Sequence, residues 1–255
     1  MSREIITLCI AAFAAGFIDA IVGGGGLVQT PAILITLPQY PVATLLGTTK
    51  IPSFTGTSVA AFQYAKKVSL QWKLLALMCI IAFAAAMAGS YTVTIVSNAF
   101  MKPVIFTMLI IVAIYTYTNK NFGTVSSTEN HPKNEWWYAT LFALAIGFYD
   151  GFIGPGAGSF LVLFFIGILK FDFLKASAHA KFVNLATNVG SIIYFGNSGH
   201  ILFHYALPMA AFSFAGSFLG ARLAILKGNT FIRIFFLLVV AGTIIRFGYD
   251  IFFKK

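Results

Sequence analysis

The two halves of this chain repeat each other at a fixed offset of 131 residues, and the alignment needs no gap. Gly16–Asp19 returns as Gly147–Asp150, and Lys50 returns as Lys181. Asp and Lys residues therefore recur in pairs, together with glycine-rich loops, inside strongly apolar sequence. A duplicated half with these features is typical of membrane transporters.

The composition also points to a membrane. Of the 255 residues, 59% are hydrophobic and 9% are charged, whereas a soluble domain carries about 25% charged residues. Residues 74–101 hold no charged side chain, and about 20 apolar residues span a bilayer. The net charge of +10 comes from Lys and Arg scattered among short loops, which argues against nucleic-acid binding and favours loops beside anionic lipid. We expect an all-α, polytopic membrane protein.

Each half begins with an apolar segment that is too long for one crossing. Residues 5–37 would form a helix of roughly 50 Å, against a hydrocarbon core of about 30 Å. Gly23–Gly26 interrupts this segment, and Gly154–Gly158 interrupts its copy. We therefore predict a glycine-tipped helical hairpin and three transmembrane helices in each half. The predicted halves are residues 1–118 and 136–255, joined by a hydrophilic linker at residues 119–135.

The positions of the basic residues distinguish two topologies. If every long segment crosses once, the basic residues outside the segments divide 8 to 6 between the two sides. With a hairpin in each half the division becomes 10 to 4, and Lys66, Lys67 and Arg222 share one side. Basic residues gather on the cytoplasmic side, so the hairpins are favoured. Five elements per half also make the halves inverted repeats, with both termini outside.

Asp19 and Asp150 lie four residues before their glycine breaks. An ionised carboxylate at the bilayer centre costs about 2.5–3.5 kcal/mol on insertion scales, so such residues usually face a cavity or a charged partner. Two interpretations stay open. The carboxylates couple transport to an ion such as the proton, or each accepts hydrogen bonds from the amides of its own glycine loop.

Each glycine loop leads into a short helix that begins inside the membrane. The free N–H groups and the dipole at such a helix start favour an anion, and Gln29, Thr30 and Ser159 add donors in the first turn. The alternative is that the glycines only permit close helix packing. A nucleotide-binding phosphate loop is not indicated, because no Gly-Lys-Ser/Thr follows and no strand precedes.

The second segment of each half carries a lysine on a polar helical face. Lys50 lies about 12 Å deep by helical rise and shares its face with Ser53, while Lys181 shares its face with Asn184 and Asn188. Two lysines related by the repeat suit an anionic substrate. The alternative is that each lysine neutralises a repeat aspartate in a buried ion pair.

The residues predicted to bind substrate come from both halves. They are Gly24, Gly25, Gly26, Gln29, Thr49, Lys50 and Ser53, with Gly156, Gly158, Ser159, Lys181, Asn184 and Asn188. The candidates for proton coupling are Asp19, Asp150 and His179; the histidine could instead be a hydrogen-bonded packing residue. The sequence contains no nucleophile–base pair, metal-ligand spacing or cofactor motif, so no enzyme, metal or cofactor is predicted.

These motifs resemble those of the sulfite exporter TauE/SafE family, and the resemblance covers essentially the whole chain. It rests on Gly16–Asp19, Gly23–Gly26 and Gly47–Lys50, and on Gly147–Asp150, Gly154–Gly158 and His179–Asn184 with Asn188. The resemblance implies secondary transport of small sulfur-containing anions (sulfite, sulfonates or sulfoacetate-like compounds) across a prokaryotic inner membrane. Pro155 departs from an all-glycine loop, which makes the two hairpin tips unequal.

We therefore predict a multi-pass transporter of the inner membrane. Its expected partners are a small anionic substrate and the lipid bilayer, without nucleic acid, and a homodimer is left open. Proton coupling is a further option. The alternatives are an anion channel, a transporter of another small oxyanion or carboxylate, and a membrane enzyme or assembly factor.

Overall fold

The computed structural model describes residues 3–101, 103–105, 107–108 and 134–253, with the backbone alone for residues 229–253. The described residues form helices and connecting turns, without a strand, so the predicted all-α fold is confirmed. The linker predicted at 119–135 lies outside this part except for its last two residues, and Glu135 already belongs to a helix.

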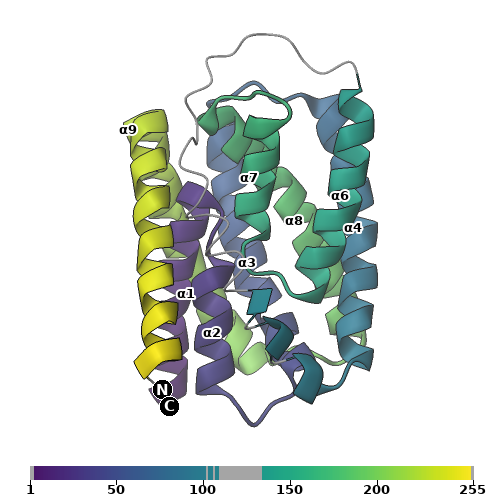
Figure 1. Cartoon of the computed structure of the whole chain (residues 1–255), viewed down its shortest axis with the longest axis vertical. Helices are drawn as coiled ribbons and strands as arrows, with labels where there is room; N and C mark the ends of the chain where they lie inside the picture. Colours follow the sequence, from purple (N-terminus) through teal and green to yellow (C-terminus); the bar gives the residue numbers. More distant parts are fainter. Residues whose placement is uncertain (1–2, 102, 106, 109–133, 254–255) are drawn as a thin grey trace.

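Among the described residues, the helices follow the predicted segments closely (Figure 1). The third transmembrane helix predicted in the first half lies mostly outside these residues. In the first half they are α1 (Arg3–Val22), α2 (Gly26–Thr36), α3 (Val42–Ala65) and α4 (Trp72–Ile95). In the second half they are α6 (Glu135–Phe152), α7 (Ala157–Gly167), α8 (Phe173–Asn197) and α9 (Phe203–Phe253), the last of which bends at Gly228. Among the described residues, α1, α4 and the part of α9 before the bend are long and apolar enough to cross a membrane.

Both predicted hairpins are present. The chain turns between α1 and α2 at Gly23, whose φ of 78° lies in the left-handed region, and between α6 and α7 at Gly154, whose φ is 94°. Glycine adopts this region without a steric penalty, which explains why the breaks fall at these residues. In Figure 1, α1 and α2 lie toward the end that holds both termini, and α7 lies toward the opposite end.

The helices sort into two bundles that exchange one helix each. The first bundle consists of α1, α2 and α3 with α9, and the second of α6, α7 and α8 with α4. Each exchanged helix therefore packs mainly on the other half of the chain, and α3 and α4 make few contacts although they are consecutive. The bundles meet chiefly along α3 and α8.

Small residues allow the exchanged helices to approach their partners closely. A Cβ at Gly16 of α1 would lie 2.5 Å from the carbonyl oxygen of Ser213 of α9, and a Cβ at Gly147 of α6 would lie 2.6 Å from that of Ala82 of α4. The two helix pairs are equivalent under the repeat. Close packing of small residues is the usual basis of helix association in lipid, so both bundles are held by backbone contact.

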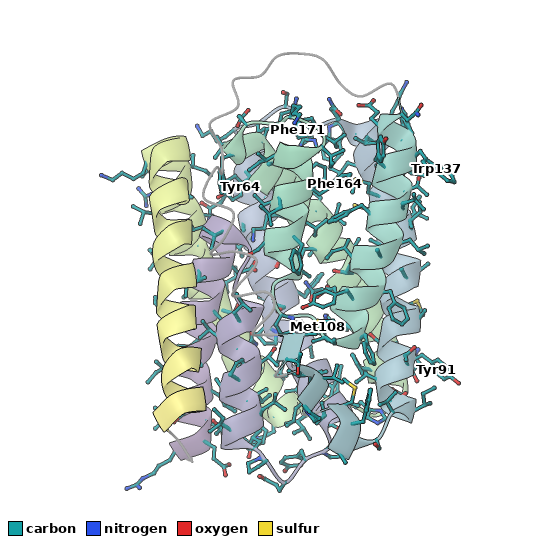
Figure 2. All side chains as sticks on the ribbon, viewed as in Figure 1. Tyr64, Tyr91, Met108, Trp137, Phe164 and Phe171 are labelled. Carbon is teal, nitrogen blue, oxygen red and sulfur yellow. The ribbon has the colours of Figure 1, made fainter. Side chains whose placement is uncertain are left out.

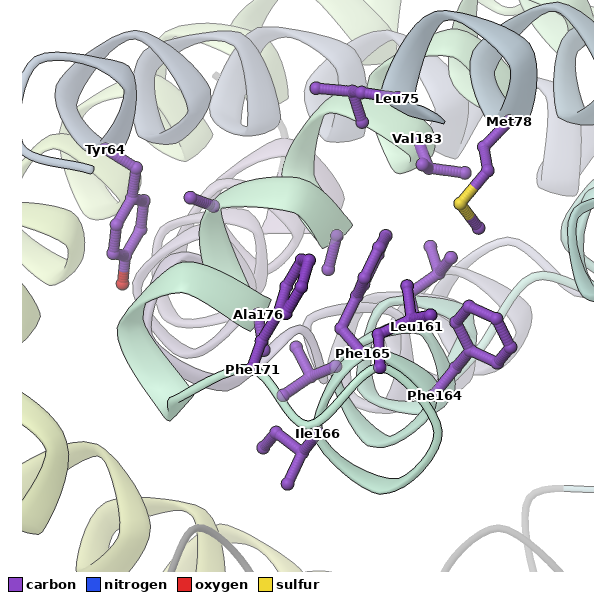
Figure 3. Packing of buried hydrophobic residues seen from close by; sticks show 14 of the residues in the cluster. Tyr64, Leu75, Met78, Leu161, Phe164, Phe165, Ile166, Phe171, Ala176 and Val183 are labelled. Carbon is purple, nitrogen blue, oxygen red and sulfur yellow. The ribbon is translucent and has the colours of Figure 1, made fainter. Parts of the chain in front are cut away.

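Aromatic and aliphatic side chains fill the second bundle between α4, α7 and α8 (Figure 3). Phe165 of α7 stacks on Phe171, with 5.7 Å between the ring centres. Trp137 and Tyr91 instead point outward from α6 and α4 (Figure 2) and are 63% and 53% exposed. An outer surface of this kind suits contact with lipid.

Basic residues gather where α3 ends. Lys66, Lys67 and Arg222 line one cavity of about 220 Å³ between the end of α3 and α9. The hairpin topology places these residues on one side of the membrane, whereas the topology with eight single crossings would separate Lys66 from Arg222.

Candidate functional site

The tips of the two hairpins touch each other. A Cβ at Gly23 would lie 2.5 Å from the carbonyl carbon of Gly158, and a Cβ at Gly158 would lie 2.5 Å from the carbonyl oxygen of Gly23. Nearby, a Cβ at Gly26 would lie 3.0 Å from Cα of Pro155. The glycines of each tip are therefore required by the backbone of the other tip, as the packing interpretation of these loops predicts.

A polar cavity of about 40 Å³ lies beside this contact. Its walls are formed by Asp19, Gly23, Gly26, Gln29, Thr30, Thr49, Lys50, Ser53, Asp150, Ile153, Gly154, Pro155, Gly156, Ala157, Gly158, Asn184 and Asn188. A single water needs roughly 10–15 Å³, so the cavity has room for a small polyatomic ion. The walls come from both bundles and from both hairpin tips.

The cavity contains a buried ion pair between the halves. Lys50 Nζ of α3 donates to Oδ1 of Asp150 at 3.1 Å and also to the carbonyl oxygen of Asp150. Both side chains are only 7% exposed. Lys50 therefore neutralises the carboxylate and satisfies a carbonyl oxygen near the end of α6.

In the equivalent pair the second half supplies the lysine and the first half supplies the aspartate. Lys181 Nζ of α8 donates to Oδ2 of Asp19 at 2.8 Å and also to the carbonyl oxygen of Asp19. Each lysine thus pairs with the aspartate of the other half, in the same pattern. The alternative in which the lysines neutralise the aspartates agrees with this geometry, and it does not exclude a contact with substrate.

The aspartates depend little on their own loops. Oδ1 of Asp19 accepts the amide of Gly25 at 3.4 Å, which is long for a hydrogen bond to a carboxylate. Among the described residues, the side chain of Asp150 has Lys50 as its hydrogen-bond donor. The ion pairs between the halves are therefore the main partners of both carboxylates.

Two asparagines on α8 continue the polar wall. Nδ2 of Asn188 donates to the carbonyl oxygen of Asn184 at 2.8 Å and lies 2.9 Å from Oδ1 of Asn184. The hydroxyl of Thr57 on α3 is within 3.4 Å of the same Oδ1 and 3.5 Å from Oδ2 of Asp19. This network joins α3 and α8 across the cavity.

Two buried polar atoms of the wall residues lack a partner. Nε2 of Gln29 and Oδ2 of Asp150 are shielded from solvent and make no hydrogen bond to the described residues. Buried polar groups are paired in most structures, and an unpaired one costs about 1–3 kcal/mol. One donor and one acceptor beside a cavity indicate a ligand that supplies the missing partners.

His179 lies apart from this site. Its Nε2 accepts the amide of Gln71 at 3.0 Å, and its Nδ1 lies 2.7 Å from the carbonyl oxygen of Lys175. The ring packs against Phe165 and Phe171, with 4.8 Å between the centres for the second. Both ring nitrogens are therefore engaged where the α3–α4 connection meets α8, as the packing interpretation of this histidine predicts.

Most of the predicted site residues line the cavity, and a few lie just outside it. Gly25 lines a smaller adjoining cavity of about 10 Å³. Lys181 is not in the cavity wall but binds Asp19, which is. The hydroxyl of Ser159 donates to the carbonyl oxygen of Val22 at 3.2 Å and so fastens the tips together. Gly24 faces Ser159 rather than the cavity.

Sequence reasoning missed several wall residues. The tip residues Ile153, Gly154 and Ala157 line the cavity but were not predicted to bind substrate, whereas Thr30, predicted as a first-turn donor, also lines it. Gly154 is the repeat of Gly23, so the repeat itself carried the signal. The hydroxyl of Tyr149 donates to the carbonyl oxygen of Pro155 at 2.6 Å and holds this tip, an interaction that the sequence gives no means to foresee.

The arrangement suits reversible binding of an anion. α2 and α7 both begin at the cavity, so their N-terminal amides and dipoles favour negative charge there. Lys50 and Gln29 add side-chain donors. The protein is all-helical, and its cavity lies where the tips of two helical hairpins meet. These features place it in the class of membrane transporters.

Comparison with known proteins identifies the family. The family model "Sulfite exporter TauE/SafE" matches residues 8–247, and the chain belongs to this family. No solved structure matches the chain.

Relatives that match over most of their length are described as probable membrane transporter proteins. The "Probable membrane transporter protein ORF9" of Sinorhizobium sp is 37% identical, over 94% of this chain and 90% of the relative. The "Probable membrane transporter protein YfcA" of Escherichia coli K12 is 30% identical, over 95% and 89% respectively. A "Probable membrane transporter protein" of Haemophilus influenzae is 32% identical, over 89% and 88%.

Proposed function

We propose that the protein is a secondary transporter of small sulfur-containing oxyanions, such as sulfite, a sulfonate or sulfoacetate, in the bacterial inner membrane. The observation that carries the proposal is the buried cavity at which α2 and α7 begin beside Lys50. Helix starts and a lysine favour an anion over a neutral or cationic ligand. The family's description names sulfite, which supports the choice of sulfur compounds.

The two halves act, in this proposal, as inverted repeats around the cavity. The reciprocal pairs Lys50–Asp150 and Lys181–Asp19 support this symmetry, as do the hairpins that approach from opposite ends (Figure 1). The ion pairs connect the two bundles, so they can open and close as one bundle rocks against the other. Such rocking around a fixed central site is a common transport mechanism.

We also propose that transport is coupled to protons. Asp19 and Asp150 line the cavity, so a change in their protonation alters the charge that the substrate meets. His179 is a weaker candidate because its ring nitrogens are engaged outside the cavity.

A transport assay in liposomes tests the proposal. Purified protein should carry labelled sulfite or sulfoacetate into liposomes, with a saturable rate, and Lys50→Gln should abolish uptake while Lys66→Gln leaves it unchanged. Lys66 is the control because it is exposed at the end of α3, away from the cavity.

Two results separate this proposal from its alternatives. Accumulation of substrate against its gradient, when a proton gradient is applied, would exclude an anion channel. A thermal-shift screen of sulfite, thiosulfate, sulfoacetate, taurine and simple carboxylates distinguishes the substrate classes. Stabilisation by neutral or cationic compounds alone would contradict the anion site.

A further inference from the structure

We propose that the anion binds together with one proton, and that Oδ2 of Asp150 carries this proton. The inference rests on the proposed function, because it assigns a role within the anion site. It arises from a difference between two aspartates that the repeat makes equivalent in sequence.

The carboxylate of Asp19 is satisfied by its surroundings. Oδ1 accepts the amide of Gly25 at 3.4 Å, and Oδ2 accepts Lys181 Nζ at 2.8 Å and lies 3.5 Å from the hydroxyl of Thr57. The Asp19 side chain is also 19% exposed. Among the described residues, both oxygens of Asp19 therefore have a donor within reach.

The carboxylate of Asp150 is only half satisfied. Oδ1 accepts Lys50 Nζ at 3.1 Å, whereas Oδ2 is buried and accepts no hydrogen bond from the described residues. A buried oxygen without a donor is left to be satisfied by a group that arrives with the ligand, and a proton is the smallest such group. Of the two repeat aspartates, Asp150 is therefore the one with a vacant buried oxygen.

Uptake of a proton keeps the site neutral when the anion binds. The positive charges of Lys50 and Lys181 cancel the negative charges of Asp19 and Asp150, so an added anion would leave the buried site with net negative charge. A proton from bulk water that forms an O–H bond at Oδ2 of Asp150 removes one negative charge. Lys50 is then free to pair with the anion in place of Asp150.

Few other ionisable groups compete for this role around Asp150. Lys50 faces it from α3, and on α6 itself the hydroxyl of Tyr149 is bound to the carbonyl oxygen of Pro155. The α4 helix contributes the hydroxyl of Ser90, which donates to the carbonyl oxygen of Gly151, and α7 (157–167) contains no titratable side chain. On α8, Lys181 is committed to Asp19.

Competition for Lys50 then couples the two ions. When the proton leaves on the other side of the membrane, the ionised Asp150 pairs again with Lys50 and displaces the anion. The anion and the proton therefore bind and leave together, with one proton for each anion.

Calorimetric titration of the detergent-purified protein with methanesulfonate tests this coupling. Methanesulfonate is the probe because its own charge does not change near neutral pH. Titrations in buffers of different ionisation enthalpy should show uptake of about one proton per bound anion. The Kd should rise about tenfold per pH unit where Asp150 is ionised, because one proton is linked to binding.

Asp150→Asn isolates the proposed proton. Its amide supplies a permanent N–H donor where Asp150 would be protonated, so binding should persist, become independent of pH and take up no proton. Asp172→Asn, at the N-cap of α8 and outside the cavity wall, is the matched control, and it should still take up about one proton. Asp150→Glu, which keeps a carboxyl group, serves as a second variant if the Asn variant is misfolded, and should retain the pH dependence.

Distinct results overturn the inference and the proposed function. Anion binding without proton uptake in the wild type, or proton uptake that survives in Asp150→Asn, would contradict this inference alone. Failure of every oxyanion in the screen to bind would contradict the anion site itself, and the inference with it.

Discussion

Nζ of Lys181 lies 2.8 Å from Oδ2 of Asp19, so a lysine of the second half neutralises a carboxylate of the first. Lys181 is only 2% exposed. Removal of one partner of a buried ion pair leaves an uncompensated charge, which costs about 3–5 kcal/mol. The pair therefore stabilises the contact between the two bundles and also forms part of the site.

Lys181→Ala should lower the thermal unfolding temperature of the detergent-solubilised protein clearly, because Asp19 is left charged and without its lysine. The double variant Lys181→Ala with Asp19→Asn should recover part of the loss, because the orphan charge is gone. Tryptophan fluorescence during heating measures both. Equal stability of Lys181→Ala and the wild type would show that the pair is not formed in the protein.

Gly158→Ala should impair both stability and transport. The added Cβ would lie 2.5 Å from the carbonyl oxygen of Gly23, so the hairpin tips must separate, at a cost of about 1–3 kcal/mol. Gly167→Ala is the matched control at the other end of α7, where a Cβ meets nothing within 4 Å. Transport rates and unfolding temperatures of the two variants check the prediction, which fails if both behave alike.

Gln29→Leu should weaken anion binding without weakening the fold. Nε2 of Gln29 is a buried donor without a partner, so its removal costs the empty protein no hydrogen bond. A hydrogen bond to a charged group contributes about 1.5–3 kcal/mol, so the affinity should fall about ten- to a hundredfold. Gln63→Leu, outside the cavity wall, is the control for the titration, and the wild type is the reference for thermal unfolding because Gln63 donates a hydrogen bond to the carbonyl oxygen of Phe218.

His179→Ala should destabilise the protein but leave its proton coupling intact. The change removes two hydrogen bonds, worth about 0.5–1.5 kcal/mol each, and the packing against Phe171. Proton flux per transported anion, measured with a pH-sensitive dye inside liposomes, should equal that of the wild type. A halved ratio would return His179 to the list of coupling residues.

Cysteine labelling tests the topology. In a background without Cys9 and Cys79, Lys66→Cys and Arg222→Cys should react with an impermeant maleimide from the same side of sealed membrane vesicles. Gln39→Cys, in the connection between α2 and α3, should react only from the other side. Reaction of the first two cysteines from opposite sides would support eight single crossings.

Much of the fold could be predicted from local sequence. The glycine breaks located both hairpins, and the second segment of the first half, which carries Lys50, forms α3. These features depend on residues that are neighbours in the chain, where helix length and glycine content are informative. The repeat then doubled the information, since each element was seen twice.

The pairing between elements could not be predicted in this way. The sequence indicated that lysines and aspartates might pair, but not that Lys50 reaches Asp150 in the other half, because this depends on how distant helices pack. The same limit applies to Gly24 and Ser159, which lie beside the cavity rather than in its wall. The unequal surroundings of Asp19 and Asp150 are likewise a property of packing, since both aspartates follow a Gly-Phe pair and precede a glycine by four residues.

The exchange of α4 and α9 has a consequence for biosynthesis. The partner that covers Gly16 of α1 is α9, which is synthesised after the other described helices. Until α9 is inserted, the small residues of α1 lack the helix that packs against them. A chain cut short before α9 would therefore leave this face of α1 uncovered in the membrane.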